Sequence, residues 1–382
     1  MGHHLANAFS DGGHRVVFLG PNGTQVPNGY HRRYLLWEDR GSAIKQREGE
    51  DGLAQDERIR RILRKACRRY QFDWIILLHP FYYAVASLDV AAELGIPCSA
   101  YFHGYELRSQ LDRIDVRRQG SVLRDRQLRT LPERTLYTTG MASEVLTNSR
   151  YTRGLLSTLP RKPRVRVTGC GIESSLLARE LSLSQSYEPE QRRARRTAMG
   201  LPEETMLTFV GRLIPAKRAD RLIDMCREDS KLSACIIGTG PDEAHLKSIC
   251  SAAGLQDRIH FAGAVEEEQK WKLLRASDFL CLLSEADDAS GQVEGFGITL
   301  LEGAAAGALP VSSGSGGMGD VVTAGHTGLI APGDDRSAAK LLVDTAADPL
   351  AMTRMIEAAR DGLATKFNWD SIARELVEGL TA

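Results

Sequence analysis

The sequence contains no long hydrophobic run and no closely paired cysteines. No apolar stretch approaches the roughly 20 residues that a membrane-spanning helix needs. None of the seven cysteines forms a C-x-x-C motif, so we expect reduced thiols in the core of a cytoplasmic protein. The first residues, MGHHLANAF, lack the basic start and the apolar stretch of a secretory signal.

Aromatic residues are scarce, and charge of one sign is not in excess overall. Aromatics make up 6% of the chain and no nucleic-acid recognition motif appears, so we expect no nucleic-acid partner. The net charge of zero hides an asymmetry, because residues 1–172 carry 27 Lys/Arg and 17 Asp/Glu, whereas the other 210 carry 22 and 32. The densest basic stretch, at 58–70, predicts either a solvated helix face or contact with an anionic partner.

Short apolar runs alternate with amphipathic stretches along the chain. Runs of this kind predict parallel strands that helices cover on both faces. With 382 residues, two doubly wound α/β domains are the natural expectation. We expect strands at 16–19, 74–78, 97–102, 144–147, 165–167, 206–210, 233–237, 258–261 and 278–283.

The domain junction is predicted from the polar segment at 173–200, which carries no strand signal. We therefore expect an N-terminal domain at 1–172, a linker at 173–200 and a C-terminal domain at 201–365. A last helix at 366–382 is expected to pack back on the N-terminal domain.

Two cations follow the first predicted strand of the C-terminal domain. In LTFVGRLIPAKR, Gly211 permits a tight turn, and Arg212 and Lys217 come at the carboxyl end of the strand. Ligands bind at this edge of open α/β sheets, and an Arg fork with a Lys point charge suits a diphosphate. The next strand ends in GTGP, where Gly238 and Gly240 bring backbone close to a ligand or serve turn geometry alone.

The segment SEADDASGQVEGFGITLLEG (284–303) carries two glutamates. Glu294 lies on a loop flanked by glycine, and a helix is expected to begin near Gly297 or Ile298 and to carry Glu302. Carboxylates accept paired hydrogen bonds from vicinal hydroxyls, as sugars and ribose present them. The alternative, a glutamate that pairs with a helix dipole, would explain Glu302 but not the Glu294 loop.

These motifs resemble the family-four retaining glycosyltransferases of the GT-B fold. The matching stretches are GRL-x3-KR, GTGP and EGFGITLLEG, whose two glutamates are separated by seven residues, followed by G-x-x-P-V. LGIPCSAYFHGYE and LTNSRYT match in the first half, so the resemblance covers almost the whole chain.

The resemblance implies a C-terminal domain that holds a UDP- or GDP-linked sugar and an N-terminal domain that holds the acceptor. Arg212 and Lys217 would neutralise the diphosphate without a metal ion or other cofactor, and the sequence offers no Asp-x-Asp or His cluster. The ADD at 286–288 is taken as solvated loop. Glu302 would bind the ribose hydroxyls and Glu294 those of the donor sugar.

Further site residues follow from the same resemblance. Phe296, Gly297 and Ile298 would offer backbone contacts, and Phe296 would shield the site from water. His103, in HGYE, would bond a donor-sugar hydroxyl rather than act as a base, and His79 is a weaker candidate for the same site. Retention without an evident nucleophile implies attack from the side on which the diphosphate leaves.

The chain departs from the family at its beginning. Family members usually start with an apolar strand and a Gly-Gly loop, whereas this sequence begins inside the helix that follows them. We therefore expect the first strand to be missing from the N-terminal domain. A version extended upstream by roughly 15–25 residues should be more soluble and more active. Gly303 and Asp320 stand where alanine and glutamate are common.

Two alternatives to a glycosyltransferase stay open. A nucleotide-sugar 2-epimerase shares the architecture but needs no acceptor, and a non-catalytic sugar-nucleotide-binding protein would bind without turnover. The acceptor is expected to be a glycan, a lipid-linked sugar or a small molecule in glycan, glycolipid or polysaccharide biosynthesis. The arginine-rich stretch at 58–70 would then place a cytoplasmic enzyme on the anionic inner face of a membrane.

Overall fold

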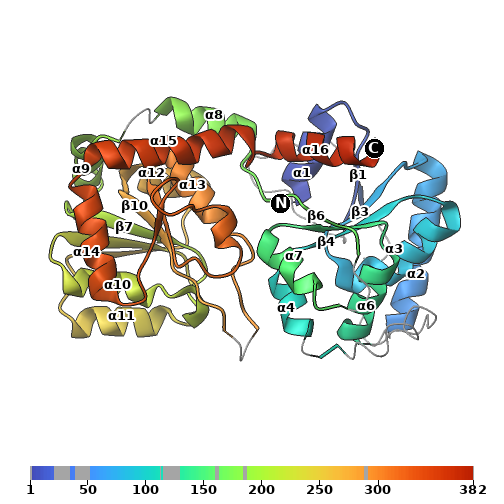
Figure 1. Ribbon diagram of the computed structural model, residues 1–382, viewed down its shortest axis with the longest axis horizontal. Helices are drawn as coiled ribbons and strands as arrows, with labels where there is room; N and C mark the ends of the chain where they lie inside the picture. Colours follow the sequence, from blue (N-terminus) through green and yellow to red (C-terminus); the bar gives the residue numbers. More distant parts are fainter. Residues whose placement is uncertain are drawn as a thin grey trace. The chain divides into compact units, whose positions relative to one another are not determined.

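The computed structural model describes residues 2–20, 35–38, 52–111, 113–114, 130–159, 163–183, 187–287 and 291–381. Contacts divide the chain into two compact units, one of Met1–Gly169 with Ile372–Ala382 and one of Cys170–Ser371. Each unit contains parallel sheet flanked by helices (Figure 1), so the predicted pair of α/β domains is confirmed.

The second unit is built on a six-stranded parallel sheet. Every residue of its strands β8 and β10 is buried, which is why these segments are almost continuously apolar. The order across the sheet is β12 (Leu329–Ile330), β11 (Leu309–Ser312), β10 (Phe279–Leu282), β7 (Thr205–Val210), β8 (Leu232–Ile237) and β9 (Ile259–Gly263).

Helices cover both faces of this sheet (Figure 1). One face carries α10 (Asp220–Glu228), α11 (Glu243–Ala252) and α14 (Asp335–Ala346). The other carries α8 (Ser174–Leu183), α9 (Pro189–Ala198), α12 (Glu267–Ala276), α13 (Ile298–Ala306) and α15 (Pro349–Thr365). Short 3₁₀ turns, η2 and η3, lie at Pro215–Lys217 and Gly316–Asp320.

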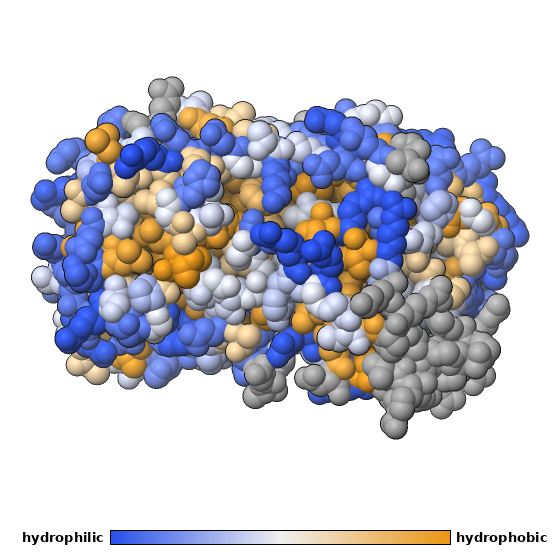
Figure 2. All heavy atoms as spheres, in the orientation of Figure 1, coloured by the Kyte–Doolittle hydropathy of each residue, from blue (hydrophilic) through white to orange (hydrophobic). Residues whose placement is uncertain are grey.

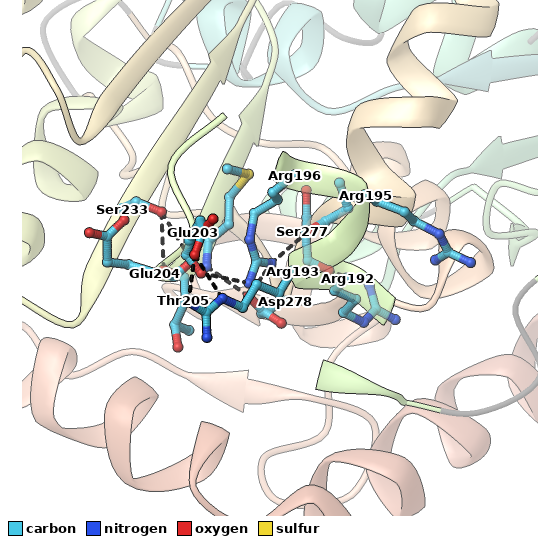
Figure 3. Close-up of polar contacts among 12 residues, drawn as sticks. Arg192, Arg193, Arg195, Arg196, Glu203, Glu204, Thr205, Ser233, Ser277 and Asp278 are labelled. Atoms are coloured by element: carbon cyan, nitrogen blue, oxygen red, sulfur yellow. Dashed lines mark hydrogen bonds and ion pairs between the residues drawn. The ribbon is translucent and has the colours of Figure 1, made fainter. Parts of the chain in front are cut away.

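The expected linker at 173–200 contains helices α8 and α9 of the second unit. Arg192 and Arg196 on α9 are buried, and they donate to the carbonyl oxygens of Ser277 and Ala276 at the end of α12. Arg196 also pairs with Asp278 at 2.8 Å (Figure 3). Arg192 and Arg196 therefore fix α9 to the end of α12 and the start of β10 rather than face water.

The first unit contains two parallel sheets. One has the order β3 (Ile75–Leu77), β4 (Cys98–Phe102), β5 (Glu144–Thr147) and β6 (Val165–Val167), and the other pairs β1 (Val17–Gly20) with β2 (Leu35–Glu38). Apolar side chains of β4, β5 and the helices packed on them form its core. The helices are α1 (Gly2–Asp11), α2 (Gly52–Tyr70), α3 (Pro80–Leu94), α4 (Tyr105–Leu111), α6 (Leu131–Met141) and α7 (Arg150–Leu156).

The last helix, α16 (Trp369–Thr381), passes from the second unit into the first. Its residues from Ile372 onward belong to the first unit, where Arg166 donates to the carbonyl oxygens of Glu375 and Leu376. Ile372 and Leu376 are buried. This segment thus packs on the N-terminal sheet through its apolar side and through carbonyls near its end.

A cavity of about 470 Å³ lies in the first unit, lined by residues of both β1 and β3. Among the described strands, β1 pairs only with β2, and β3 only with β4. Phe9, Val17, Phe18, Trp74 and Ile76 are among its lining residues. The expected strand upstream of α1 stays a prediction.

All nine expected strands are present, with ends that differ from the expected ones by at most two residues. Strands β2, β11 and β12 were not predicted from the sequence. No helix within the described residues is long and apolar enough to cross a bilayer. On the face drawn in Figure 2, hydrophobic residues reach the surface in patches separated by hydrophilic ones.

Candidate active site

The strand order places a topological switch point in the second unit. The chain runs from β7 outward to β8 and β9 on one side, and from β10 outward to β11 and β12 on the other. Open α/β sheets bind ligands outside the carboxyl ends of the strands at such a point. The loops after β7 and β10 carry four of the predicted site residues: Gly211, Arg212, Lys217 and Glu294.

Glycines at 238 and 240 let the loops after β7 and β8 lie against each other. A Cβ on Gly238 would stand 1.9 Å from the carbonyl oxygen of Gly211, and one on Gly240 would stand 2.2 Å from that of Leu213. The Leu213 N–H donates to the Thr239 carbonyl at 2.9 Å. Close backbone packing accounts for both glycines, so they are required whether or not a ligand touches them.

Lys217 and Glu294 form an ion pair between these two loops. The Lys217 ammonium donates to Oε2 of Glu294, and Oε1 accepts the Gly297 N–H at 3.0 Å. The side chains are 26% and 16% exposed, so both stay within reach of solvent. An anion that binds Lys217 would therefore compete with Glu294 for the ammonium.

The loop that carries Glu294 packs against a second glycine-containing segment, at Gly316 and Gly317. The Glu294 carbonyl accepts the Gly317 N–H at 2.8 Å, and a Cβ on Gly316 would stand 2.3 Å from that oxygen. Gly297 adopts a φ of 93° as the residue before α13, a conformation that favours glycine. The sequence thus fixes the loop through backbone contacts.

The side chains of Phe296 and Ile298 differ in their exposure to solvent. The Phe296 side chain is 2% exposed and meets the Phe367 ring edge-on at 5.8 Å between centroids, so it anchors the loop in the core. The predicted shielding of the site by this ring stays a prediction. Ile298 is 38% exposed at the start of α13.

Arg212 is exposed and makes no side-chain hydrogen bond or ion pair with any residue that the structure describes. Arg218, by contrast, binds Asp220 and Glu285. Its backbone has a φ of 53°, which is uncommon for a residue with a side chain. Of the cations in this loop, Arg212 is the one whose guanidinium is not already neutralised within the described part of the chain.

Glu302 has a partner that the sequence did not reveal. Lys270 on α12 donates to its Oε1 at 3.0 Å and also lies 2.9 Å from Oε1 of Glu267. Burial raises the pKa of the Glu302 carboxyl, and the Lys270 charge offsets part of that rise. For Lys270, burial acts to lower the pKa, but the two carboxylates outweigh it and raise the pKa.

His103 lies in the first unit, whereas Lys217 and Glu294 belong to the second. Its Nε2 is 2.9 Å from the Leu78 carbonyl oxygen, which can only accept, so Nε2 carries the proton. The His103 ring stacks on the Tyr101 ring, with centroids 4.8 Å apart. The centroid of the His79 ring lies 5.7 Å from that of His103. Burial lowers the pKa of His103, which favours the neutral imidazole.

Among the described residues, no group of three or more His, Cys, Asp or Glu side chains is placed to hold a metal ion. Of the ADD at 286–288, Asp288 lies outside the described residues, and the Asp287 N–H donates to the Gln292 carbonyl at 2.8 Å.

Two family models together match nearly the whole chain. The model described as "Glycosyltransferase Family 4" matches residues 2–176, and "Glycosyl transferases group 1" matches residues 191–362. The chain belongs to the family-four glycosyltransferases of the GT-B fold. The predicted family and fold class are thereby confirmed, whereas the roles of the individual site residues stay predictions.

Curated relatives of this chain are similar over part of their length. A D-inositol 3-phosphate glycosyltransferase of Rhodococcus opacus is 31% identical over 209 residues, which are 50% of this chain and 44% of that protein. A GDP-mannose-dependent alpha-(1-6)-phosphatidylinositol monomannoside mannosyltransferase of Mycolicibacterium smegmatis is 28% identical over 199 residues, 51% and 52% of the two chains. The match spans about half the length of these relatives.

Solved glycosyltransferases share the fold over most of the chain. A glycosyltransferase from Rickettsia africae has a TM-score of 0.74 at 15% identity, covering 98% of this chain and 92% of that one. HepE of Anabaena, solved in complex with UDP, has a TM-score of 0.69 at 17% identity. The match covers 91% of this chain and 86% of HepE. At such identities the likeness concerns the fold alone.

Proposed function

We propose that this protein transfers a sugar from a nucleotide-diphosphate sugar to an acceptor hydroxyl, with retention of the anomeric configuration and without a metal ion. The observation that carries the proposal is the Lys217–Glu294 ion pair at the switch point of the second sheet. It joins a cation suited to phosphate and a carboxylate suited to sugar hydroxyls across adjacent loops. Family membership supports the same reaction class.

Donor binding would rearrange this ion pair. The diphosphate of a UDP- or GDP-linked sugar would bind Arg212, whose guanidinium is exposed, and would draw the Lys217 ammonium away from Glu294. Released from Lys217, Oε2 of Glu294 would accept hydrogen bonds from donor-sugar hydroxyls, while Oε1 keeps the Gly297 N–H. Glu302 would bind the ribose.

The chemical step needs no enzyme nucleophile. The bond between C1 of the sugar and the diphosphate oxygen breaks as the acceptor oxygen bonds to C1 from the same side. The acceptor's proton passes to the departing diphosphate, so the configuration at C1 is kept. Arg212 and Lys217 stabilise the charge that develops on the leaving group, usually the largest single contribution to catalysis. His103 would be neutral, and its Nε2–H donates to the Leu78 carbonyl oxygen. Its other ring nitrogen, Nδ1, would orient a hydroxyl of the donor sugar.

The acceptor is proposed to be lipid-linked, at the inner face of a membrane. Helix α2 exposes Arg61, Lys65, Arg68 and Arg69, at the spacing of one helical face. Two other arginines of this helix are engaged: Arg60 pairs with Asp89 at 2.7 Å and Arg64 with Glu93 at 2.8 Å. A row of four cations that have no acidic partner among the described residues suits anionic lipid headgroups.

A donor screen tests the proposal. Nucleotide-sugars and free nucleoside diphosphates are added to the protein and the unfolding midpoint is measured, because a ligand of the native state raises it. The stabilising donor is then incubated with and without candidate acceptors. Retained-configuration glycoside supports the proposal, an epimerised donor without acceptor indicates a 2-epimerase, and binding without turnover indicates a non-catalytic protein.

A further inference from the structure

Lys270 is a buried cation that the reaction described above does not use. Its side chain is 14% exposed, and its ammonium lies between the carboxylates of Glu302 on α13 and Glu267 on its own helix. We propose that Lys270 is a positioning residue that holds Glu302 for the ribose hydroxyls of the donor. This inference rests on the proposed function, because it concerns the same nucleotide site.

The hydrogen bonds divide the two oxygens of Glu302 between protein and ligand. Lys270 binds Oε1 at 3.0 Å, and Oε2 has no hydrogen-bond partner among the residues that the structure describes. Fixing one oxygen sets the plane of the carboxylate and the direction of the other. The arrangement leaves an oriented acceptor for a hydroxyl, which is what recognition of ribose requires.

Lys270 is itself held in place. The neighbouring Trp271 is fully buried, and its indole N–H donates to Oε1 of Glu267 at 2.7 Å. The same oxygen lies 2.9 Å from the Lys270 ammonium, which also stands 5.4 Å from the Trp271 ring centroid. Trp271, Glu267, Lys270 and Glu302 thus form a connected chain from the core of the unit to the proposed ribose site.

The charge of Lys270 matters because Glu302 is buried. Burial raises the pKa of this carboxyl, and Lys270 opposes that rise. Without Lys270, more of the Glu302 population would be protonated near neutral pH, and a protonated carboxyl has lost one accepting site. Ribose recognition in such a variant should therefore weaken further as the pH falls.

The same helix supplies a matched control. Lys272 also has an acidic partner on its own helix, Glu268 at 2.9 Å, but its side chain is 51% exposed and contacts no residue of α13 in the described chain. Lys272→Met removes the same charge from the same helix without touching Glu302. It should leave nucleotide binding unchanged.

The experiment compares ribonucleotides with 2′-deoxyribonucleotides. Dissociation constants of the stabilising nucleoside diphosphate and of its 2′-deoxy form are measured for the wild type, Lys270→Met, Lys270→Gln, Lys270→Arg and Lys272→Met. We expect the preference for ribose to fall about tenfold in Lys270→Met, the size of one hydrogen bond to a charged group. The loss should be smaller in Lys270→Gln, and Lys270→Arg should restore the preference. Affinity for the 2′-deoxy form should hardly change.

The outcomes separate this inference from the function on which it rests. If the wild type binds no nucleoside diphosphate, the proposed function fails. If the wild type prefers ribose and Lys270→Met and Lys270→Gln keep that preference at pH values from about 6 to about 8, the inference about Lys270 alone is overturned. Because the preference is a ratio for one preparation, a partly unfolded variant does not mimic the expected result.

Discussion

The Lys217 ammonium donates a hydrogen bond to the Glu294 carboxylate although the two residues are 77 positions apart in the sequence. The pair bridges the loops that follow β7 and β10, the two strands at the switch point. A second bond, from the Glu285 N–H to the Ala216 carbonyl at 3.0 Å, joins the same loops. The two charges neutralise each other in this pair, and under the proposed function an anionic ligand and a polyol would together replace this one internal contact.

Removing either site cation should slow turnover without unfolding the protein. We expect Arg212→Ala and Lys217→Ala each to reduce kcat at least about a hundredfold, because each loses a group that stabilises the leaving diphosphate. Arg212→Ala should keep the wild-type unfolding midpoint, since its side chain contacts no other described residue. Arg227→Ala, an exposed cation of α10, serves as control and should keep full activity. Near-normal rates in both site variants would sink the assignment.

Gly238→Ala should destabilise the second unit strongly. The added Cβ would stand 1.9 Å from the Gly211 carbonyl oxygen, and the backbone φ of 134° disfavours any side chain. The added Cβ and the Gly211 carbonyl oxygen cannot move apart by a side-chain rotation. We therefore expect a loss of more than ~2 kcal/mol in the free energy of unfolding, measured with urea. The control is Gly254→Ala, with a φ of 66° and open space around its Cβ. That variant should lose only about 1 kcal/mol, and equal losses in the two would contradict the steric argument.

Arg196→Met should be far more damaging than Arg193→Met on the same helix. Arg196 pairs with Asp278 (Figure 3), and both side chains are almost wholly buried. Removing Arg196 leaves the Asp278 carboxylate with Tyr187 and the Met206 N–H as its remaining donors among the residues that the structure describes. We expect Arg196→Met to cost about 3 kcal/mol of unfolding free energy. Arg193 binds Glu203 at the surface, and its replacement should leave the urea midpoint nearly unchanged. Similar midpoints for the two variants would show that the buried pair is not a major contributor.

The sequence predicted the strands and the Glu294 loop because local patterns determine them. Apolar runs between helical patterns mark buried parallel strands, and glycines around Glu294 mark a loop that needs unusual backbone. Strand β11 was missed because it contains Pro310 and follows an alanine-rich helix, and β12 because it has two residues.

The partners of charged side chains could not be predicted from the sequence where tertiary packing determines them. Lys270 and Lys272 both follow a glutamate by three or four residues on α12, so their local sequences are equivalent. Only the packing of α13 against α12 gives Lys270 a second carboxylate. In the same way, Arg192 and Arg196 look solvated in the sequence but donate to carbonyls at the end of α12.

The imidazole of His103 should titrate below the ordinary range. Burial lowers its pKa from the usual 6.5, with the Leu78 carbonyl acting in the opposite direction. Folding lowers the pKa of this imidazole. Its contribution to the free energy of unfolding is therefore present above the pKa of the unfolded state and is lost as the pH falls toward the pKa of the folded state. We expect the His103 ring resonance, followed by NMR with a His103→Gln variant for assignment, to have a midpoint below 6.5. A midpoint at or above 6.5 would contradict the buried, neutral imidazole.

Replacing Arg61, Lys65, Arg68 and Arg69 by glutamine should release the protein from anionic membranes. Each cation near such a surface contributes about 1 kcal/mol, so four substitutions should lower binding to vesicles that contain phosphatidylglycerol by well over tenfold. The control changes four exposed cations of the second unit, Arg227, Lys231, Lys272 and Arg336, which removes the same net charge from elsewhere. Sedimentation with anionic and with neutral vesicles measures both variants. If the two bind alike, net charge and not helix α2 governs the contact; if the wild type shows no preference for anionic vesicles, the membrane-facing acceptor loses its support.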